Sequence, residues 1–465
     1  MKLNLFPAET YSKRRQQLAQ AVNKGLILLP GNTESSMNYK DNQYPFRQDS
    51  SFLYYAGLDI PGLTLIIDAE NGTTTLFGNE LSMDDIIWTG PLPSLQEQAA
   101  AVGISSIEPL SQVSSILSTA LAKKQTVHIL DPYRGDTAIQ IAEWLGVNTS
   151  GLQPFVSETL IRSIVQQREI KEAGEVAELH EANSISADMH IAGMELTREG
   201  LYEYEIAARV ESIALAGNGR LAYPIILSMN GQTLHNHYHG NKLDTGRMIL
   251  CDAGAENSKH YAGDLTRTFP VAKRFSVQQK EIYEVVLDSM NHAISLLHPG
   301  ITFREVHKQA AIQIVTGLKN IGLITGDVNE AVEAGVHTLF FPHGLGHMIG
   351  LDVHDMENLG ENYVGYTETL QRSKEFGWKS LRLAKELKPG FVLTIEPGIY
   401  FIPELIAKWQ SEKKLEAFIN YKSLQSYLSF GGIRIEDNFL ITADGSRKLG
   451  KHLAKTVKEL EEIRG

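Results

Sequence analysis

The stretch "RMILCDAGAENSKHYAGDLTRTFP", residues 247–270, decides how the larger part of this chain folds. Its two apolar runs, 247–254 and 260–270, predict strands, and "AENSK" between them predicts the turn of a hairpin. Asp252 ends the first strand and Asp264 begins the second, so antiparallel pairing would bring the two carboxylates to one point. The first expectation is therefore an acidic site on an antiparallel sheet.

The length and the order of elements predict two domains, because 465 residues are too many for one hydrophobic core. In the first part of the chain, apolar strands alternate with amphipathic helices, which predicts an α/β domain over residues 1–157. Runs of helices and runs of strands then follow, starting with a continuous helical stretch over 158–194, and predict an α+β domain over 158–465. The strands expected in the first domain are "GLILLPG" (25–31), the hairpin "LTLIIDAENGTTTLFG" (63–78) and "QTVHIL" (125–130).

The composition excludes several classes of protein. A net charge of −12 argues against nucleic acid as the main partner. A single cysteine, Cys251, excludes an internal disulfide framework and a thiolate metal cluster. The N-terminus lacks the apolar core of a signal peptide, and the chain has no apolar run of about 18 residues. We therefore expect a cytoplasmic protein without a membrane partner.

Two further carboxylates lie on strands whose other face is apolar. In "VLTIEPG", Glu396 alternates with Leu393 and Ile395, so it lies on the opposite face from them. In "GIRIED", Glu436 stands in the same relation to its apolar neighbours. Four carboxylates on one sheet face would repel one another unless a cation lay among them. The strands thus predict a metal site.

The stretch "FPHGLGHMIGLDVHD", residues 341–355, adds His343, His347 and His354. One imidazole together with four carboxylates makes a set of oxygen and nitrogen donors that suits Mn, Zn, Co or Fe(II), and it is large enough for a two-metal centre. The spacing of His343 and His347 is that of the helical zinc motif H-E-x-x-H. The intervening Gly-Leu-Gly and the missing glutamate exclude that interpretation.

Together these segments resemble a known superfamily. "DAGAENSKHYAGDLTRTFP", "FPHGLGHMIGLDVHD", "VLTIEPGIYF" and "GGIRIEDNFLIT" are similar to the metal-binding segments of the methionine aminopeptidase, aminopeptidase P and prolidase superfamily. "YPFRQDSSFLYYAGLDIPG" resembles the non-catalytic domain of the aminopeptidase P and prolidase branch. The resemblance runs nearly end to end, which excludes the short methionine aminopeptidases. It implies an α/β N-terminal domain and an α+β "pita-bread" catalytic domain, a curved antiparallel sheet flanked by helices that carries a dinuclear metal centre.

The resemblance also implies a role for each site residue. Asp264 and Glu436 would bridge two divalent ions, for which Mn²⁺ is our prediction and Co²⁺ or Zn²⁺ the alternatives. Glu396 would take the proton of the attacking water, and His354 would donate a hydrogen bond to the oxyanion. The five metal ligands would be Asp252, Asp264, His347, Glu396 and Glu436. The substrate pocket would be lined by His343 and His235, with His237 and His239 as alternatives to His235.

The activity implied is hydrolysis of the Xaa-Pro bond at the N-terminus of short proline-containing peptides. "KSLRLAKELKPG" places Arg382 where prolidases bind the free carboxylate of a dipeptide, which favours an Xaa-Pro dipeptidase. Aminopeptidase P, which acts on longer peptides, carries an arginine in the same neighbourhood and is the alternative. The alternative interpretation of Arg382 itself is a surface arginine on a helix.

Two further alternatives are a metal-free, creatinase-like enzyme and an inactive binding module on the same fold. The full set of ligand types argues against both. Arg434 is expected to hold Glu436 or Asp264 in place as a neighbour of the ligands. The resemblance further implies a homodimer or homotetramer.

Overall fold

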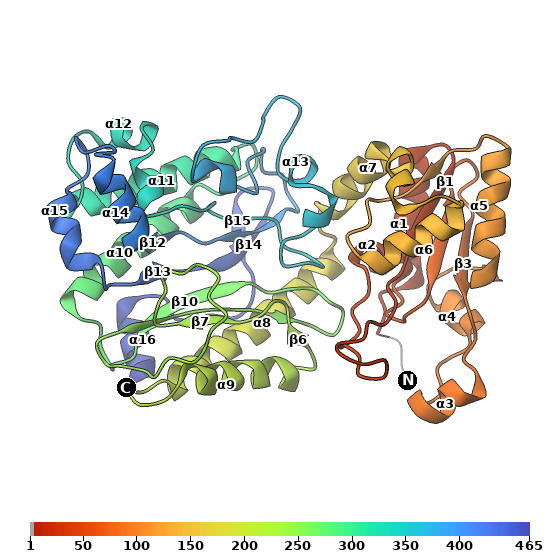
Figure 1. Cartoon of the computed structure of the whole chain (residues 1–465), viewed down its shortest axis with the longest axis horizontal. Helices are drawn as coiled ribbons and strands as arrows, with labels where there is room; N and C mark the ends of the chain where they lie inside the picture. The colour runs from red at the N-terminus through yellow and green to blue at the C-terminus, as the bar shows by residue number, and fades with distance from the viewer. Residues whose placement is uncertain (1–3) are drawn as a thin grey trace. The chain divides into compact units, whose positions relative to one another are not determined.

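The computed structural model describes residues 4–465, which fall into two compact units (Figure 1). The first unit is the chain up to Arg168 together with 358–363, and the second is Glu169–Glu357 together with Val364–Gly465. Helix α7, Glu158–Arg168, thus belongs to the first unit, whereas the sequence placed a domain boundary after residue 157. That boundary stays a prediction. Among the described residues, no helix is both long and apolar enough to cross a membrane.

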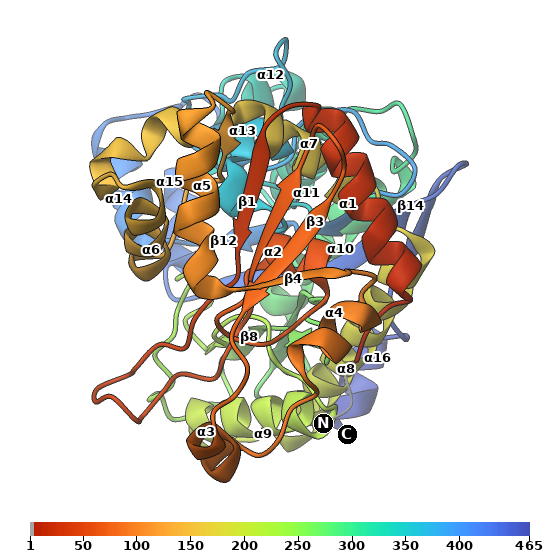
Figure 2. The ribbon, with the colours of Figure 1, turned by 90° about the vertical axis from the view of Figure 1, so that its right-hand side faces the viewer.

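The first unit is built on a five-stranded sheet in the order β4-β3-β2-β1-β5. Strand β1 pairs antiparallel with β2 and parallel with β5, and β2 and β3 form the expected hairpin. Figure 2 shows this sheet with α1 on one side and α5 and α6 on the other. The strands are β1 (Leu26–Pro30), β2 (Thr64–Asp68), β3 (Thr74–Gly78), β4 (Ser106–Pro109) and β5 (Val127–His128). The helices are α1 (Ala8–Val22), α2 (Ser50–Ala56), α3 (Met83–Thr89), α4 (Leu95–Ala101), α5 (Val113–Ala122), α6 (Gly135–Leu145) and α7.

Alternating apolar residues bury both faces of this sheet. Leu26 and Leu28 of β1 pack with Leu117 of α5 and Ile141 of α6 in one core cluster. Ile27, between them, is also fully buried and faces the other side. The α/β class expected for the N-terminal part of the chain is confirmed.

The continuous helical stretch expected over 158–194 is wrong, because the chain breaks between α7 and α8 (Ala173–Leu196). Within the break, the backbone N–H of Lys171 donates to the carbonyl of Gly390. Glu172 then caps α8 in a capping box with Glu175. Tertiary hydrogen bonds and the cap outweigh the local helical pattern here.

The second unit consists of small antiparallel sheets flanked by helices (Figure 1). The sheets are β10-β8-β7, β11-β14-β15, β12-β13 and β6-β9. The strands are β6 (Arg220–Leu221), β7 (Ile226–Ser228), β8 (Met248–Ala253), β9 (Ala255–Glu256), β10 (Leu265–Pro270), β11 (Val392–Ile395), β12 (Gly398–Tyr400), β13 (Gly432–Arg434), β14 (Asp437–Ile441) and β15 (Ser446–Lys448). The helices are α8, α9 (Glu203–Ala216), α10 (Val277–Ser295), α11 (Phe303–Asn320), α12 (Val328–Glu333), α14 (Pro403–Ser411), α15 (Tyr421–Leu424) and α16 (Val457–Arg464); α13 (Glu361–Val364) spans the division between the units. The α+β class is confirmed.

The register of β8 and β10 places the first two carboxylates on one face. Asp252 pairs with Thr266, and Asp264 precedes Thr266 by two residues. Residues diagonal to each other in an antiparallel pair lie on the same face and within reach of one another. The predicted antiparallel pairing of the two strands is confirmed. The predicted turn is wrong in part, because Ala255 and Glu256 form strand β9, which pairs with β6.

The two strands expected to carry Glu396 and Glu436 are both interrupted at these glutamates. Chain 390–401 divides into β11 and β12 at Glu396 and Pro397, and chain 430–442 divides into β13 and β14 at Glu436. Pro397 has no N–H to donate to a ladder, and its carbonyl instead accepts from the backbone of Ile435 at 3.3 Å. Both glutamates thus lie at one break between two strand pairs.

Candidate functional site

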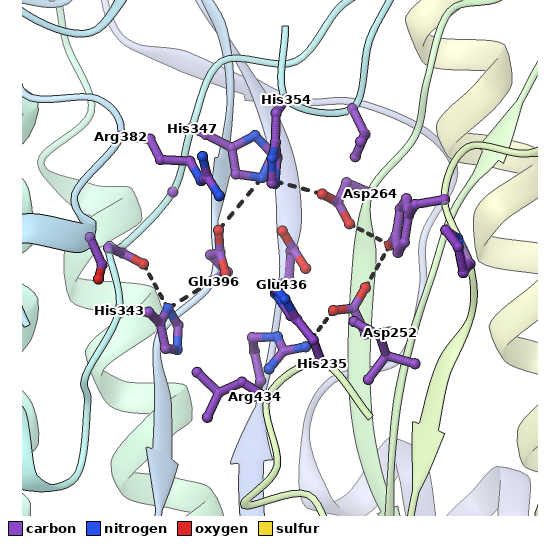
Figure 3. Close-up of a pocket in the computed structure, with 18 of the residues that line it drawn as sticks. His235, Asp252, Asp264, His343, His347, His354, Arg382, Glu396, Arg434 and Glu436 are labelled. Carbon is purple, nitrogen blue, oxygen red and sulfur yellow. Dashed lines mark hydrogen bonds and ion pairs between the residues drawn. The ribbon is translucent and has the colours of Figure 1, made fainter. Parts of the chain in front are cut away.

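One cavity of about 570 Å³ in the second unit contains every site residue named from the sequence. Figure 3 shows carboxylates and imidazoles from different strands and loops converging on it. The residues concerned are His235, Asp252, Asp264, His343, His347, His354, Arg382, Glu396 and Glu436.

Three of these residues form a compact donor set. One ligand atom each from Asp264, His347 and Glu436 lie within 4.8 Å of one another, and all three side chains are buried. His347 Nε2 is 3.3 Å from Asp264 Oδ2. Its Nδ1 lies 3.0 Å from the Met348 carbonyl, which only accepts, so Nδ1 carries a proton and Nε2 faces the carboxylates. This orientation is the one that a metal-binding histidine adopts.

Asp252 joins this set through Tyr223. The Tyr223 hydroxyl is 2.6 Å from Asp252 Oδ1 and 2.5 Å from Asp264 Oδ1. A hydroxyl has one proton and donates to one of the two carboxylates at a time. The other carboxylate then faces a lone pair of the hydroxyl oxygen, which repels it. A nearby cation would offset this repulsion.

Arg434 supports the set from the side of β13. It donates to Asp252 through Nη2 and to Tyr400 Oη at 2.8 Å through Nη1. Its Nε donates to Thr266 Oγ1 at 3.1 Å, and Thr266 in turn donates to Glu436 Oε2 at 2.7 Å. The carboxylate that Arg434 contacts directly is therefore Asp252, and not Glu436 or Asp264 as the sequence suggested.

The donor set fits divalent cations on three counts. Glu436 Oε1 is buried without a hydrogen-bond partner among the described residues. Burial and the neighbouring Asp264 raise the pKa of Glu436 well above its usual range, and burial likewise raises the pKa of Asp252. A bound cation would give Glu436 Oε1 a partner and would offset the cost of burying the charged carboxylates. The donors are oxygens and an imidazole nitrogen, which suit hard or borderline metals.

Glu396 lies between two histidines. Its Oε1 is 3.6 Å from His347 Nε2, and its Oε2 is 3.7 Å from His343 Nδ1. Burial raises the pKa of Glu396 to about 7, although His347 and Arg434 act in the opposite direction. A carboxylate with this pKa can both accept and release a proton near neutral pH.

His343 is held in one tautomer. Its Nδ1 is 2.8 Å from the Gly344 carbonyl, so Nδ1 donates, and Nε2 accepts from the Tyr400 hydroxyl at 2.8 Å. Burial lowers the pKa of His343 to about 3, which keeps the ring neutral. His343 therefore contributes an uncharged ring to the pocket wall beside Glu396.

The three histidines of "TLHNHYHG" occupy different positions. His235 and His237 line the cavity, whereas His239 does not and has its Nε2 3.1 Å from the Ile225 carbonyl. Burial lowers the pKa of His235, and Arg434 adds to that effect. The choice of His235 as the substrate contact stays a prediction, with His237 as the alternative that remains.

His354 and Arg382 share one carboxylate, that of Glu357. His354 Nδ1 is 2.6 Å from Glu357 Oε2, and Arg382 Nη1 is 2.5 Å from Glu357 Oε1. Since a carboxylate only accepts, His354 Nδ1 carries the proton, and Nε2 can donate only when the ring is doubly protonated. Burial and His347 lower the pKa of His354, and the hydrogen bond to Glu357 opposes them. Arg382 lies in the loop after a 3₁₀ turn (Trp378–Ser380), and not on a helix.

The sequence did not identify Tyr223, Tyr400, Thr266 or Glu357. Tyr400 had a detectable signal, because it follows Glu396 by four residues and strand alternation places it on the same side. Thr266 could have been identified in the same way, because it follows Asp264 by two residues and strand alternation places both on the same side. Tyr223 lies in a loop and Glu357 begins a three-residue 3₁₀ turn, Glu357–Leu359, so neither has a periodicity that indicates a direction.

Comparison with protein families gives two matches. The profile of metallopeptidase family M24 matches residues 177–443, and that of the aminopeptidase P N-terminal domain matches residues 11–130. Together the two matches account for most of the chain, in the same order as the two units.

Named relatives match over nearly the whole length. A human Xaa-Pro dipeptidase is 30% identical over 472 residues, covering 98% of this chain and 93% of the relative. A probable Xaa-Pro aminopeptidase of Paracoccidioides brasiliensis is 31% identical over 474 residues, covering 98% and 97%. Among solved structures, zinc-substituted Escherichia coli aminopeptidase P in complex with product superposes with a TM-score of 0.81 at 27% identity, covering 99% of both chains. Aminopeptidase P II of Yersinia pestis gives the same values.

Proposed function

The chain belongs to metallopeptidase family M24, and we propose that it is a two-metal exopeptidase that hydrolyses the Xaa-Pro bond at the N-terminus of short peptides. The observation that carries this proposal is the cavity itself. It unites four buried or nearly buried carboxylates, an imidazole oriented as a ligand, and four further histidines. The relatives named for Xaa-Pro activity support the choice of substrate.

The residues that would hold two divalent cations are Asp252, Asp264, His347, Glu396 and Glu436. When bound, the cations supply Lewis-acid activation of water and polarisation of the scissile carbonyl. We propose Mn²⁺ as the native metal, and Co²⁺ and Zn²⁺ also suit these donors.

The proton transfers fall to residues of the chain. Glu396, which lies between His347 and His343, would accept a proton from the attacking water and release it toward the leaving nitrogen. His354 would contact the developing oxyanion through Nε2 when its ring is doubly protonated, a state that the hydrogen bond to Glu357 favours and that burial and His347 oppose. The neutral His343 and His235 would form the pocket for the proline ring, whose nitrogen carries no N–H for a backbone contact.

Within this activity we favour an Xaa-Pro dipeptidase, in which Arg382 would bind the free carboxylate of the dipeptide. Arginine suits this role because its planar fork matches a carboxylate. The ion pair between Arg382 and Glu357 favours the second candidate, aminopeptidase P, because it already engages the guanidinium. A cytoplasmic location and a homodimeric or homotetrameric assembly stay predictions from the sequence.

The test is to compare proline release from Ala-Pro with release of the N-terminal residue from Ala-Pro-Ala, each with Mn²⁺ added. Preferential cleavage of Ala-Pro is the expected result. Preferential cleavage of the tripeptide would make the protein an aminopeptidase P. Tight metal binding without cleavage of either peptide would contradict the enzymatic proposal and favour a binding module.

A further inference from the structure

We infer that Glu357 is a positioning residue that sets how strongly this site favours a substrate with a free carboxylate. The inference rests on the proposed Xaa-Pro activity. Its starting point is that one side chain contacts two residues of the pocket, His354 through Oε2 at 2.6 Å and Arg382 through Oε1 at 2.5 Å. Figure 3 shows His354 and Arg382 on the same side of the cavity.

The backbone around Glu357 fixes this arrangement. The neighbouring Asp355 forms an ion pair with Lys171 at 2.8 Å, and both side chains are only 1% exposed. Met356 is buried and has a φ of 63°, a left-handed conformation that a methionine keeps only where its surroundings demand it. The N–H of Glu357 also donates to the His354 carbonyl at 3.2 Å. Glu357 is therefore directed toward His354 by its own chain segment.

Both members of the ion pair are charged near neutral pH. The hydrogen bond from His354 and the charge of Arg382 lower the pKa of Glu357 to about 2, and an arginine stays protonated. A substrate carboxylate that binds Arg382 would therefore meet a second carboxylate on the same guanidinium. The repulsion between the two carboxylates weakens binding of a dipeptide but does not affect a substrate that lacks the free carboxylate.

The two contacts of Glu357 have separable consequences. The contact with His354 orients a ring that every substrate meets, so its loss should lower kcat for all substrates. The contact with Arg382 affects only substrates in which the proline carries a free carboxylate. Its loss should therefore change KM for those substrates alone. A dipeptide and its C-terminal amide differ in this charge and therefore separate the two roles.

The experiment measures kcat and KM of the Mn²⁺-loaded protein for Ala-Pro and for Ala-Pro amide. Gln keeps the shape of the side chain and one acceptor oxygen but removes the charge. In Glu357→Gln we expect KM for Ala-Pro to fall about two- to fivefold, the range of a partly exposed ion pair, and KM for the amide to stay constant. In Glu357→Ala we expect kcat to fall about tenfold for both substrates, because His354 loses its acceptor.

Three further variants serve as controls. Glu412→Gln removes another exposed ion pair, with Lys408 at 2.6 Å on α14, and should leave both KM values unchanged. In an Arg382→Ala background, Glu357→Gln should no longer change the ratio of the two KM values, because the shared cation is gone. Glu357→Asp keeps the charge, so it should keep the ratio near that of the unsubstituted protein even if kcat falls.

Two results would overturn the inference. The first is a folded Glu357→Gln variant with an unchanged ratio of the two KM values, and the second is the same change of ratio in the Arg382→Ala background. Should the unsubstituted protein cleave neither compound, the proposed function fails instead. Calorimetric binding of Ala-Pro and its amide then gives the same ratio without turnover and decides the role of Glu357 separately.

Discussion

The floor and the rim of the cavity are built in different ways. On the floor, Asp252, Asp264 and Glu436 are between 2% and 8% exposed, and they are held by contacts between neighbouring strands. On the rim, the side chains of Arg382 and Glu357 are 31% and 43% exposed, and they are held mainly by each other and by His354.

The difference indicates that the floor carries the chemistry and the rim determines substrate preference. Charges on the buried floor cost free energy unless a cation lies among them, so their positions are fixed by the fold. Charges on the rim are solvated, and an exposed ion pair contributes only about 0–1 kcal/mol to stability. A change at Arg382 should therefore alter substrate preference without disturbing the buried carboxylates, and the predictions that follow test this separation.

The largest effect is expected on the floor. Asp264→Asn keeps the size of the side chain but removes the charge from a residue that contacts both His347 and Tyr223. Loss of a ligand should exceed the roughly 10–100-fold that loss of an outer-shell partner costs, so we expect kcat/KM to fall by more than about 100-fold. Elemental analysis should show less bound metal at the same time.

The matched control for this prediction is Asp288→Asn, which changes an exposed aspartate on α10. It should retain full activity and metal content. An Asp264→Asn variant with normal metal content and activity would contradict the assignment of the floor.

A second prediction concerns the metal-free protein. The pKa of Glu396 is raised to about 7, and those of Asp252 and Glu436 are raised as well. The folded protein then binds protons that the unfolded chain releases, so this part of the stability is present below about pH 4.5 and is lost as the pH rises through 7. For Glu396 alone the change is on the order of 3 kcal/mol.

Urea unfolding in the presence of a chelator, at about pH 5 and about pH 8, measures this effect. The metal-free protein should be less stable at the higher pH, and added Mn²⁺ should reverse the trend, since it binds the ionised carboxylates. In Glu396→Gln the decrease should become smaller. Greater stability of the metal-free protein at the higher pH would show that burial does not raise the pKa values of the floor carboxylates.

The same contrast explains what could be predicted from the sequence. Strand alternation and hairpin pairing are local rules, and they were sufficient to predict that Asp252, Asp264, Glu396 and Glu436 lie together, although the structure brings them to one cavity from separate sheets. The local rule failed at 169–172, where contacts with residues more than 180 positions away broke a helical pattern. It failed again at Pro397, where one expected strand is two.

The arrangement of the rim residues could not be predicted from strand alternation or hairpin pairing. Arg382 and His354 were named through resemblance, but Glu357, which contacts both, was not. Its position depends on the left-handed backbone at Met356 and on the buried pair of Lys171 and Asp355, two features that no periodicity in the sequence encodes. The direct partner of Arg434 was misjudged for the same reason, since it depends on how separate strand pairs meet.

The smallest effect is expected at the rim. Arg382→Lys keeps the positive charge but replaces a planar fork by a single ammonium group, which cannot bind two carboxylates with the same geometry. We expect KM for Ala-Pro to rise about threefold to tenfold, with kcat and the KM for Ala-Pro amide unchanged. A loss of kcat as large for the amide as for the dipeptide would instead make Arg382 part of the catalytic floor, and the separation of floor and rim would not hold.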